Sequence, residues 1–140
     1  MLVVIDTNVM LSAFAKQSPS APLFRAVAEG RLRLAVTSSI LLEYEEIAEH
    51  RGGSAFAARM MHWLSLVSAA YQTIVLVHPS FQFHIITGDP DDNKFTDCAI
   101  AAEAVFVITG DSHFASLANA GFKPQPITAL EFILRHLPEV

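Results

Sequence analysis

The chain has 140 residues, of which 52% are hydrophobic, and it carries a formal net charge of −5 at pH 7. This length and composition predict one globular domain over residues 1–140, large enough to bury a core without disulfides. A single cysteine, Cys98, excludes an internal disulfide, and no apolar run approaches the 18 residues of a membrane span. With no signal-peptide pattern at the N-terminus, we expect a cytoplasmic protein without a membrane segment, and Cys98 as a small buried helix residue.

Short apolar runs alternate with helical patterns along the whole chain. In chain order the sequence predicts strand 2–5, helices 9–15 and 21–30, strand 33–36, helices 39–49 and 54–71, strand 73–77, helix 93–104, strand 105–108, and helices 112–119 and 128–137. The turn between the third and fourth helices is expected at Gly52-Gly53. Strands separated by helices indicate an α/β fold with a parallel sheet covered on both faces.

Two aspartates directly follow predicted strands. Asp6 comes after strand 2–5, and Asp111 follows strand 105–108 with two residues between. In an open parallel sheet, ligands collect at the carboxyl ends of the strands. Either aspartate could instead cap the helix that follows it. The polar neighbours Thr7, Asn8 and Thr109 favour a shared site.

Glu43 is the glutamate placed among apolar neighbours. Its helix presents one mostly charged stripe, and Glu43 lies on the other, beside Ile40, Tyr44 and Ile47. An unpaired buried carboxylate costs several kcal/mol or shifts its pKa sharply. We therefore expect a cation or a basic partner beside Glu43.

Asp97 follows the same logic in helix 93–104, where Ile100 and Ala104 share its face and Thr96 and Glu103 are expected on the exposed side. The acidic run just before it resembles the start of a calcium loop. That interpretation fails, because Lys94 replaces the glycine at the sixth position and Ile100 the glutamate at the twelfth.

Other polar residues around these acids have more than one interpretation. Asp92 or Asn93 is expected to cap the helix, and a supporting contact to the site stays open. Asp89 is expected in a turn. Lys94 is expected to be solvated, with a contact to substrate phosphate as the alternative, and His113 is expected at the surface.

If Asp6, Glu43, Asp97 and Asp111 converge, the cluster is unstable when all four carboxylates are ionised and no cation is bound. Each pair about 4 Å apart would repel by roughly 1–4 kcal/mol at effective dielectrics between water and a protein surface. Such a cluster takes up protons or binds a hard cation, and an oxygen-only ligand set suits Mg²⁺ or Mn²⁺. Zinc is poorly served, because the single cysteine and six histidines show no ligand spacing.

At this point the chain resembles the PIN-domain family. The resemblance lies in four segments that together cover nearly the whole chain in the expected order: Val3–Val9, Ser39–Glu43, Asp89–Ala99 and Val107–Asp111. The run Asp89–Phe95 is most similar to the branch that holds VapC-type toxins of toxin–antitoxin systems.

The resemblance implies a three-layer fold with about five parallel strands in the order 3-2-1-4-5, flanked by helices. It implies a ribonuclease that uses Mg²⁺ or Mn²⁺ and leaves a 5′-phosphate and a 3′-hydroxyl. Asp6, Glu43, Asp97 and Asp111 match the family's catalytic, metal-binding acids, and Thr7, Asn8 and Thr109 match its polar supports. Asp91 and Asp92 lie close to the third acid, and the helical placement favours Asp97. An RNA substrate, a cognate antitoxin and a homodimer are also implied.

The same residues argue against two other classes of protein. A haloacid dehalogenase needs a second aspartate where this chain has Asn8, and a receiver domain needs a lysine after its late strand, where this chain has Asp111 alone. A catalytically inactive PIN-like module that binds RNA or protein stays open. A net negative charge disfavours nucleic acid, unless bound cations neutralise it and surface arginines guide the polyanion. Trp63, Leu64 and Leu66 fit a dimer or antitoxin surface as well as core packing.

Overall fold

The computed structural model describes residues 1–15, 17–79, 93–118 and 120–137. Its centre is a five-stranded sheet in the order β3-β2-β1-β4-β5, with every neighbouring pair parallel. The strands are β1 (Leu2–Ile5), β2 (Arg33–Val36), β3 (Ile74–Leu76), β4 (Phe106–Ile108) and β5 (Gln125–Ile127). The predicted fold class and strand order are confirmed.

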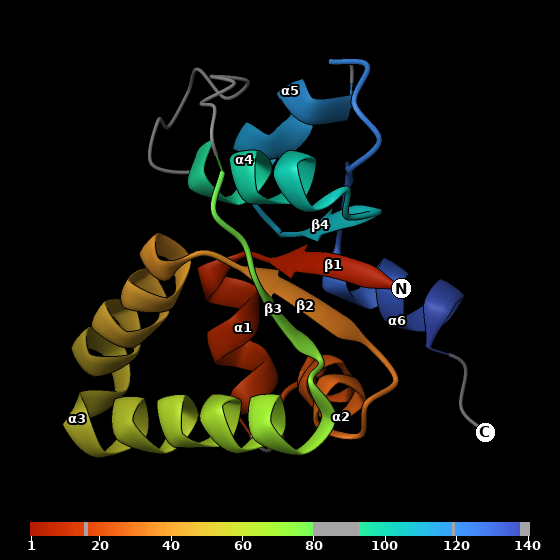
Figure 1. Cartoon of the computed structure of the whole chain (residues 1–140). Helices are drawn as coiled ribbons and strands as arrows, with labels where there is room; N and C mark the ends of the chain where they lie inside the picture. The colour runs from red at the N-terminus through yellow and green to blue at the C-terminus, as the bar shows by residue number, and fades with distance from the viewer. Residues whose placement is uncertain (16, 80–92, 119, 138–140) are drawn as a thin grey trace.

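Helices cover both faces of the sheet in three layers (Figure 1). The first face carries α1 (Thr7–Phe14), α2 (Ala21–Ala28) and α3 (Ser38–Tyr71). The opposite face carries α4 (Asn93–Ala102), the 3₁₀ turn η2 (Ser112–Phe114) and α5 (Ala115–Ala118). The last helix, α6 (Ala129–His136), contacts α2. In the part of the chain described here, no helix is both long enough and apolar enough to cross a membrane.

The central strands consist of continuous apolar runs because both of their faces are buried. Val3–Ile5 of β1, Leu34–Val36 of β2 and Val107–Ile108 of β4 are fully buried. Parallel strands with helices on both sides bury their two faces equally, so alternation of polar and apolar residues is absent from them. The same cover buries Cys98 in α4 and raises the pKa of its thiol to about 12, which confirms the predicted core role.

A sharp kink divides α3 into two arms, which Figure 1 shows running in different directions. The kink lies at Gly53, whose φ of +86° suits a residue without a side chain. The adjacent Gly52 lets the Phe56 ring approach the backbone, since a β-carbon there would lie 2.5 Å from that ring. The predicted division at Gly52-Gly53 is confirmed. The helix begins at Ser38 because the Thr37 hydroxyl caps it, accepting from Ile40 N at 3.1 Å.

The fifth strand is the element that the sequence pattern missed. Strand β5 has three residues with Pro126 in the middle, and proline normally argues against a strand. It is tolerated here because β5 is at the edge of the sheet and pairs with β4 on one side. Gln125 N and Ile127 O, on either side of Pro126, make the bonds to Val105 and Thr109.

Tyr44 ties α3 to the central strand. Its side chain is fully buried, and its hydroxyl donates a hydrogen bond to the Ile5 carbonyl. Burial raises the pKa of this phenol well above its ordinary value, and the nearby Cys98, Asp6 and Glu43 raise it further. The hydroxyl therefore stays protonated and able to donate.

Replacing Tyr44 by Phe should destabilise the protein by roughly 1–3 kcal/mol, because the buried Ile5 carbonyl loses this donor. The measurement is urea unfolding of the two proteins, followed by circular dichroism. Tyr71→Phe is the matched control, since Tyr71 is 57% exposed, and it should change the free energy of unfolding by less than about 0.5 kcal/mol. Equal effects of the two substitutions would contradict the role given to the Tyr44 hydroxyl.

Candidate functional site

The candidate site lies where β1 and β4 end side by side. Ile5 pairs with Ile108 in the parallel ladder, and the Asp6 amide donates to the Ile108 carbonyl at 3.0 Å. β1 has β2 on one side and β4 on the other, so the order of strands reverses at this point. Crevices at such reversals are where α/β sheets hold ligands.

The Asp6 carboxylate is held by two donors at the end of β1. One of its oxygens accepts from the Thr7 amide at 2.7 Å, and the other accepts from the Thr109 hydroxyl at 2.8 Å. Asp6 is also the N-cap of α1, with extended backbone angles of −61° and 151°. The two interpretations of Asp6 are therefore compatible, because a cap and a site residue can be the same side chain.

The charge of Asp6 is poorly solvated. Only 6% of the residue is exposed, and this burial is the main cause that raises the pKa of its carboxyl above 3.8. The hydrogen bonds from Thr109 and Thr7 lower the pKa, whereas the charges of Asp111 and Glu43 raise it. The three carboxylates are thus close enough to interact, and a cation beside Asp6 would relieve the burial and the repulsion together.

Glu43 reaches the same region from the first arm of α3. One carboxylate oxygen accepts from the Thr7 hydroxyl, and the other forms an ion pair of 2.7 Å with Lys94 Nζ. The side chains of Lys94 and Glu43 are 24% and 23% exposed. The basic partner expected for a half-buried Glu43 is therefore Lys94, and the expectation of a solvated Lys94 is wrong.

Asp111 lies at the outer edge of the site. Its amide donates to the Thr109 hydroxyl at 3.0 Å, so Thr109 connects Asp111 to Asp6. Its carboxylate accepts from the His113 amide at 2.9 Å and lies 3.2 Å from the His113 ring nitrogen. The Asp111 side chain is one-third exposed, so it caps η2 while facing solvent.

A cavity of about 400 Å³ opens beside these acids. Its described lining consists of Asp6, Asn8, Val9, Ser12, Ser20, Gly110 and Asp111. Asn8 is exposed at the start of α1, where its amide can reach a ligand in this cavity. Ser12, one helical turn after Asn8, was missed by sequence reasoning, although the spacing of four was the available signal.

Asp97 lies on the buried side of α4, which packs against β1, β2 and β4. The Thr96 beside it is fully buried, and its hydroxyl donates to the Asn93 carbonyl at 3.1 Å. The predicted exposure of Thr96 is therefore wrong, because α4 is covered over most of its surface rather than on one stripe. Asn93, the first residue of α4, is also buried, whereas Asp89, Asp91 and Asp92 lie outside the described residues.

The acids are arranged as a hydrogen-bonded network rather than as a formed metal cage. Thr7 joins Asp6 to Glu43, because its amide donates to Asp6 and its hydroxyl donates to Glu43. The Thr109 hydroxyl donates to Asp6 and accepts from the Asp111 amide, and Lys94 neutralises Glu43. Across residues 1–15, 17–79, 93–118 and 120–137, no group of three or more acidic, histidine or cysteine side chains is close enough to hold a metal ion.

A family model described as PIN domain matches residues 2–113. No curated protein sequence matches the chain. Twelve chains of solved structures match it, including the following two. The VapBC2 complex from Rickettsia felis, bound to a DNA fragment from its promoter, aligns with a TM-score of 0.57 and 16% identity, over 90% of this chain and 98% of that one. The RRP44 PIN domain of T. brucei aligns with a TM-score of 0.54 and 14% identity, over 95% of this chain and 79% of that one.

Asp6→Asn should make the metal-free protein more stable at neutral pH. Because the folded-state pKa of Asp6 is raised, the native protein binds this proton more tightly than the unfolded chain. Stability is therefore lost as pH rises from 3.8 through the folded pKa, by about 1.4 kcal/mol for each unit of the shift.

The measurement is thermal unfolding in EDTA between pH 4 and pH 8. The advantage of Asp6→Asn should be largest at pH 7 and shrink toward pH 4. Glu46→Gln, which changes an exposed carboxylate on α3, should show no such trend. A variant less stable than the wild type at pH 7 would mean that the hydrogen bonds of Asp6 outweigh its desolvation.

Proposed function

The chain belongs to the PIN domain family, and we propose that it acts as a metal-dependent endoribonuclease, the toxin of a toxin–antitoxin pair. The observation that carries this proposal is the network of Asp6, Glu43 and Asp111 at the carboxyl ends of β1 and β4. Three acids joined through two threonines contribute little to the core. A site for a divalent cation would explain why these acids lie close together.

The side chains fit Mg²⁺ or Mn²⁺ better than other metals. The donors at the site are carboxylate and hydroxyl oxygens, and these hard ligands suit Mg²⁺ and Mn²⁺. The raised pKa of Asp6 marks a carboxylate that lacks a counter-charge. Asp6 and Asp97 would hold the ion directly, with Glu43 and Asp111 completing the shell or acting through water.

The chemistry supplied by a bound divalent cation is polarisation of a phosphate oxygen and activation of a water molecule for attack on phosphorus. The chain's own residues position these groups. Thr7 and Thr109 fix the two oxygens of Asp6, and Thr7 also fixes Glu43. Asn8 borders the cavity where the phosphodiester would lie, and Asn93 at the start of α4 would support Asp97. Asp92, which lies outside the described residues, is a second candidate for this support.

Lys94 would change partner when the site is loaded. Its Nζ forms an ion pair of 2.7 Å with Glu43. If Glu43 held a cation instead, the ammonium group of Lys94 would be available to the phosphate of the RNA. One lysine thus keeps the acids compatible before loading and contributes positive charge afterwards.

The toxin assignment rests on the resemblance of the run Asp89–Phe95 to VapC-type toxins, together with the shared fold of the VapBC2 complex. It implies a cognate antitoxin protein, a homodimer and a cytoplasmic location. Leu130 and Leu134 of α6 are 63% and 72% exposed, and Leu66 of α3 is 47% exposed. These apolar side chains would be covered in a complex with either protein partner.

A catalytically inactive binding module is the second candidate. The observation in its favour is that Glu43 is engaged by Lys94 and that no three described acids stand close enough to hold a metal. Cation binding alone does not separate the two functions, because either protein could take up a cation. Turnover of RNA separates them.

Purified protein should cleave RNA with Mn²⁺ or Mg²⁺ and lose this activity in EDTA. Asp6→Asn should reduce the cleavage rate at least about 100-fold, since the remaining acids cannot hold the ion that activates water. Glu46→Gln, with the same change of charge on an exposed part of α3, should cleave like the wild type. Equal cleavage by all three proteins would point to a contaminating ribonuclease, and folded proteins without activity would favour the binding module.

Mn²⁺ should also raise the melting temperature of the wild type without any RNA present. A ligand at 100 times its dissociation constant stabilises the folded state by about 2.7 kcal/mol. Asp6→Asn should lose most of this gain, and Glu46→Gln should keep it. The measurement is differential scanning calorimetry across a Mn²⁺ titration, and an equal gain in Asp6→Asn would place the ion elsewhere.

A further inference from the structure

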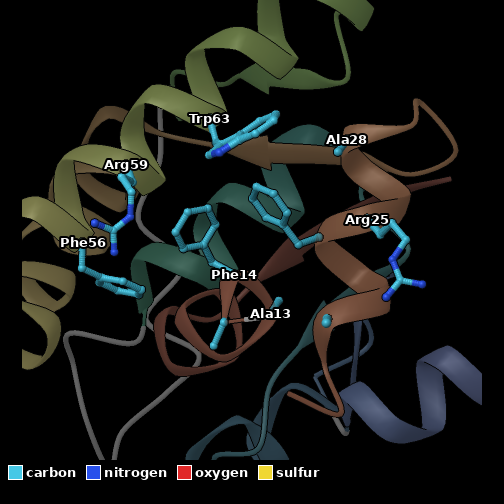
Figure 2. Close-up of a pocket in the computed structure, with 10 residues that line it drawn as sticks. Ala13, Phe14, Arg25, Ala28, Phe56, Arg59 and Trp63 are labelled. Carbon is cyan, nitrogen blue, oxygen red and sulfur yellow. The ribbon is translucent and has the colours of Figure 1, made fainter. Parts of the chain in front are cut away.

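A second and larger cavity lies between α1, α2 and the second arm of α3. It measures about 630 Å³, and Figure 2 shows its labelled lining residues coming from these three helices. Phe56, Arg59 and Trp63 approach it from α3, Ala13 and Phe14 from α1, and Arg25 and Ala28 from α2. None of the acids in the network, Asp6, Glu43 and Asp111, lines this cavity.

Aromatic rings form the floor and the rim of this aromatic pocket. Phe14 makes edge-to-face contacts with Phe24 at 5.1 Å and with Phe56 at 5.5 Å. Trp63 lies at the rim with 48% of its surface exposed, whereas its neighbour Leu64 is buried. An exposed indole beside a packed ring cluster is a platform on which a flat ligand can stack.

Positive charge gathers along the same surface. Of the nine lysines and arginines in the chain, Arg25 and Arg59 line the aromatic pocket and Arg51 lies just before the kink of α3. Arg31 and Arg135 form ion pairs with glutamates, but within the described chain Arg51 and Arg59 form none. On a protein with a net charge of −5, unpaired arginines at one place indicate an anionic ligand.

Shared lining residues link the aromatic pocket to the acids. A cavity of about 300 Å³ lies between them, lined in its described part by Asn8, Leu11, Ser12, Arg51, Gly52 and Phe56. It shares Asn8 and Ser12 with the cavity at Asp6 and Asp111, and it shares Phe56 with the aromatic pocket. The three neighbouring cavities, called the groove below, thus follow one another from the acids, past Arg51, to Arg59 and Trp63.

We propose that this groove binds single-stranded RNA that flanks the cleaved bond, with one base stacked on Trp63 and its phosphates beside Arg51 and Arg59. The proposal rests on the proposed function, because it identifies the groove by its connection to the acids. Aromatic platforms and a cationic track are how proteins bind unpaired strands without reading their sequence. An apolar protein segment would pack against the aromatic rings equally well, but it would leave the arginines and the link to Asp6 without a role.

Trp63 is the single tryptophan of the chain, so its fluorescence reports on this pocket alone. The experiment titrates the protein with a fluorescein-labelled oligoadenylate of about 12 nucleotides, in EDTA to prevent cleavage and at low salt. Binding should quench Trp63 emission, and the anisotropy of the labelled RNA should give the affinity. Trp63→Ala and Arg59→Ala should each weaken binding about 10-fold, and Arg59→Ala should flatten the salt dependence by about 0.7 in log–log slope.

Two exposed controls match these variants. Arg31→Ala removes one positive charge, as Arg59→Ala does, at a residue that does not line the three cavities. Leu66→Ala removes an apolar side chain of α3 that is exposed to the same degree as Trp63. Both should bind RNA within about twofold of the wild type. All five proteins should keep the same circular dichroism spectrum, since the altered side chains are exposed.

The outcomes separate this proposal from the nuclease itself. Quenching with loss of affinity in Trp63→Ala and Arg59→Ala supports the groove, whether or not the protein cleaves RNA. Unchanged Trp63 emission, or affinities that none of the variants alters, overturns the groove even if cleavage is intact. In that case an apolar protein segment becomes the occupant of the aromatic pocket.

Discussion

The burial of the Asp6 carboxylate is the constraint on which the arrangement of the site depends. A charge at the end of the central strand has lost most of its contact with water, and each of its oxygens must be met by a donor from the protein. The Thr7 amide and the Thr109 hydroxyl supply these donors because α1 begins at once after β1 and β4 ends alongside. Their bonds lower the pKa of Asp6 only in part against the effect of burial. A cation beside Asp6 would offset the part of the desolvation cost that these hydrogen bonds leave uncompensated.

The elements around this strand are positioned by the same requirement. The first arm of α3 presents Glu43 and Tyr44, two successive residues that do different work. Tyr44 donates to the carbonyl just before Asp6, and Glu43 accepts from the hydroxyl of Thr7, whose amide donates to Asp6. On the opposite face α4 supplies Lys94, which neutralises Glu43. Every described carboxylate in the network accepts a hydrogen bond or forms an ion pair, although no three of the described acids are close enough together to hold a metal ion.

Charge is divided unequally over the groove that begins at this site. Its inner end carries Asp6 and Asp111, whereas its outer parts carry Arg25, Arg51 and Arg59. Net charge alone disfavoured a nucleic-acid partner, but the average hides this separation. A divalent ion at the acids would cancel the charges of Asp6 and Asp111, so the arginines would then set the charge that the groove presents to a polyanion. The aromatic rings at the far end would add stacking to this electrostatic attraction.

The sequence by itself determined the α/β class, the buried central strands, the place of Asp6 after a strand and the inward position of Glu43 on its helix, because these depend on local patterns. An aspartate after a continuous apolar run must lie near a strand end, and helical periodicity separated Glu43 from the exposed glutamates beside it. Contacts between distant segments were decided by the tertiary structure. The Lys94–Glu43 pair joins residues 51 positions apart, Thr96 is buried because α4 is covered on more than one side, and β5 exists because an edge position tolerates Pro126. Trp63 and Leu64 are adjacent in sequence, yet packing exposes one and buries the other, so only the fold could show which of them is available to a ligand.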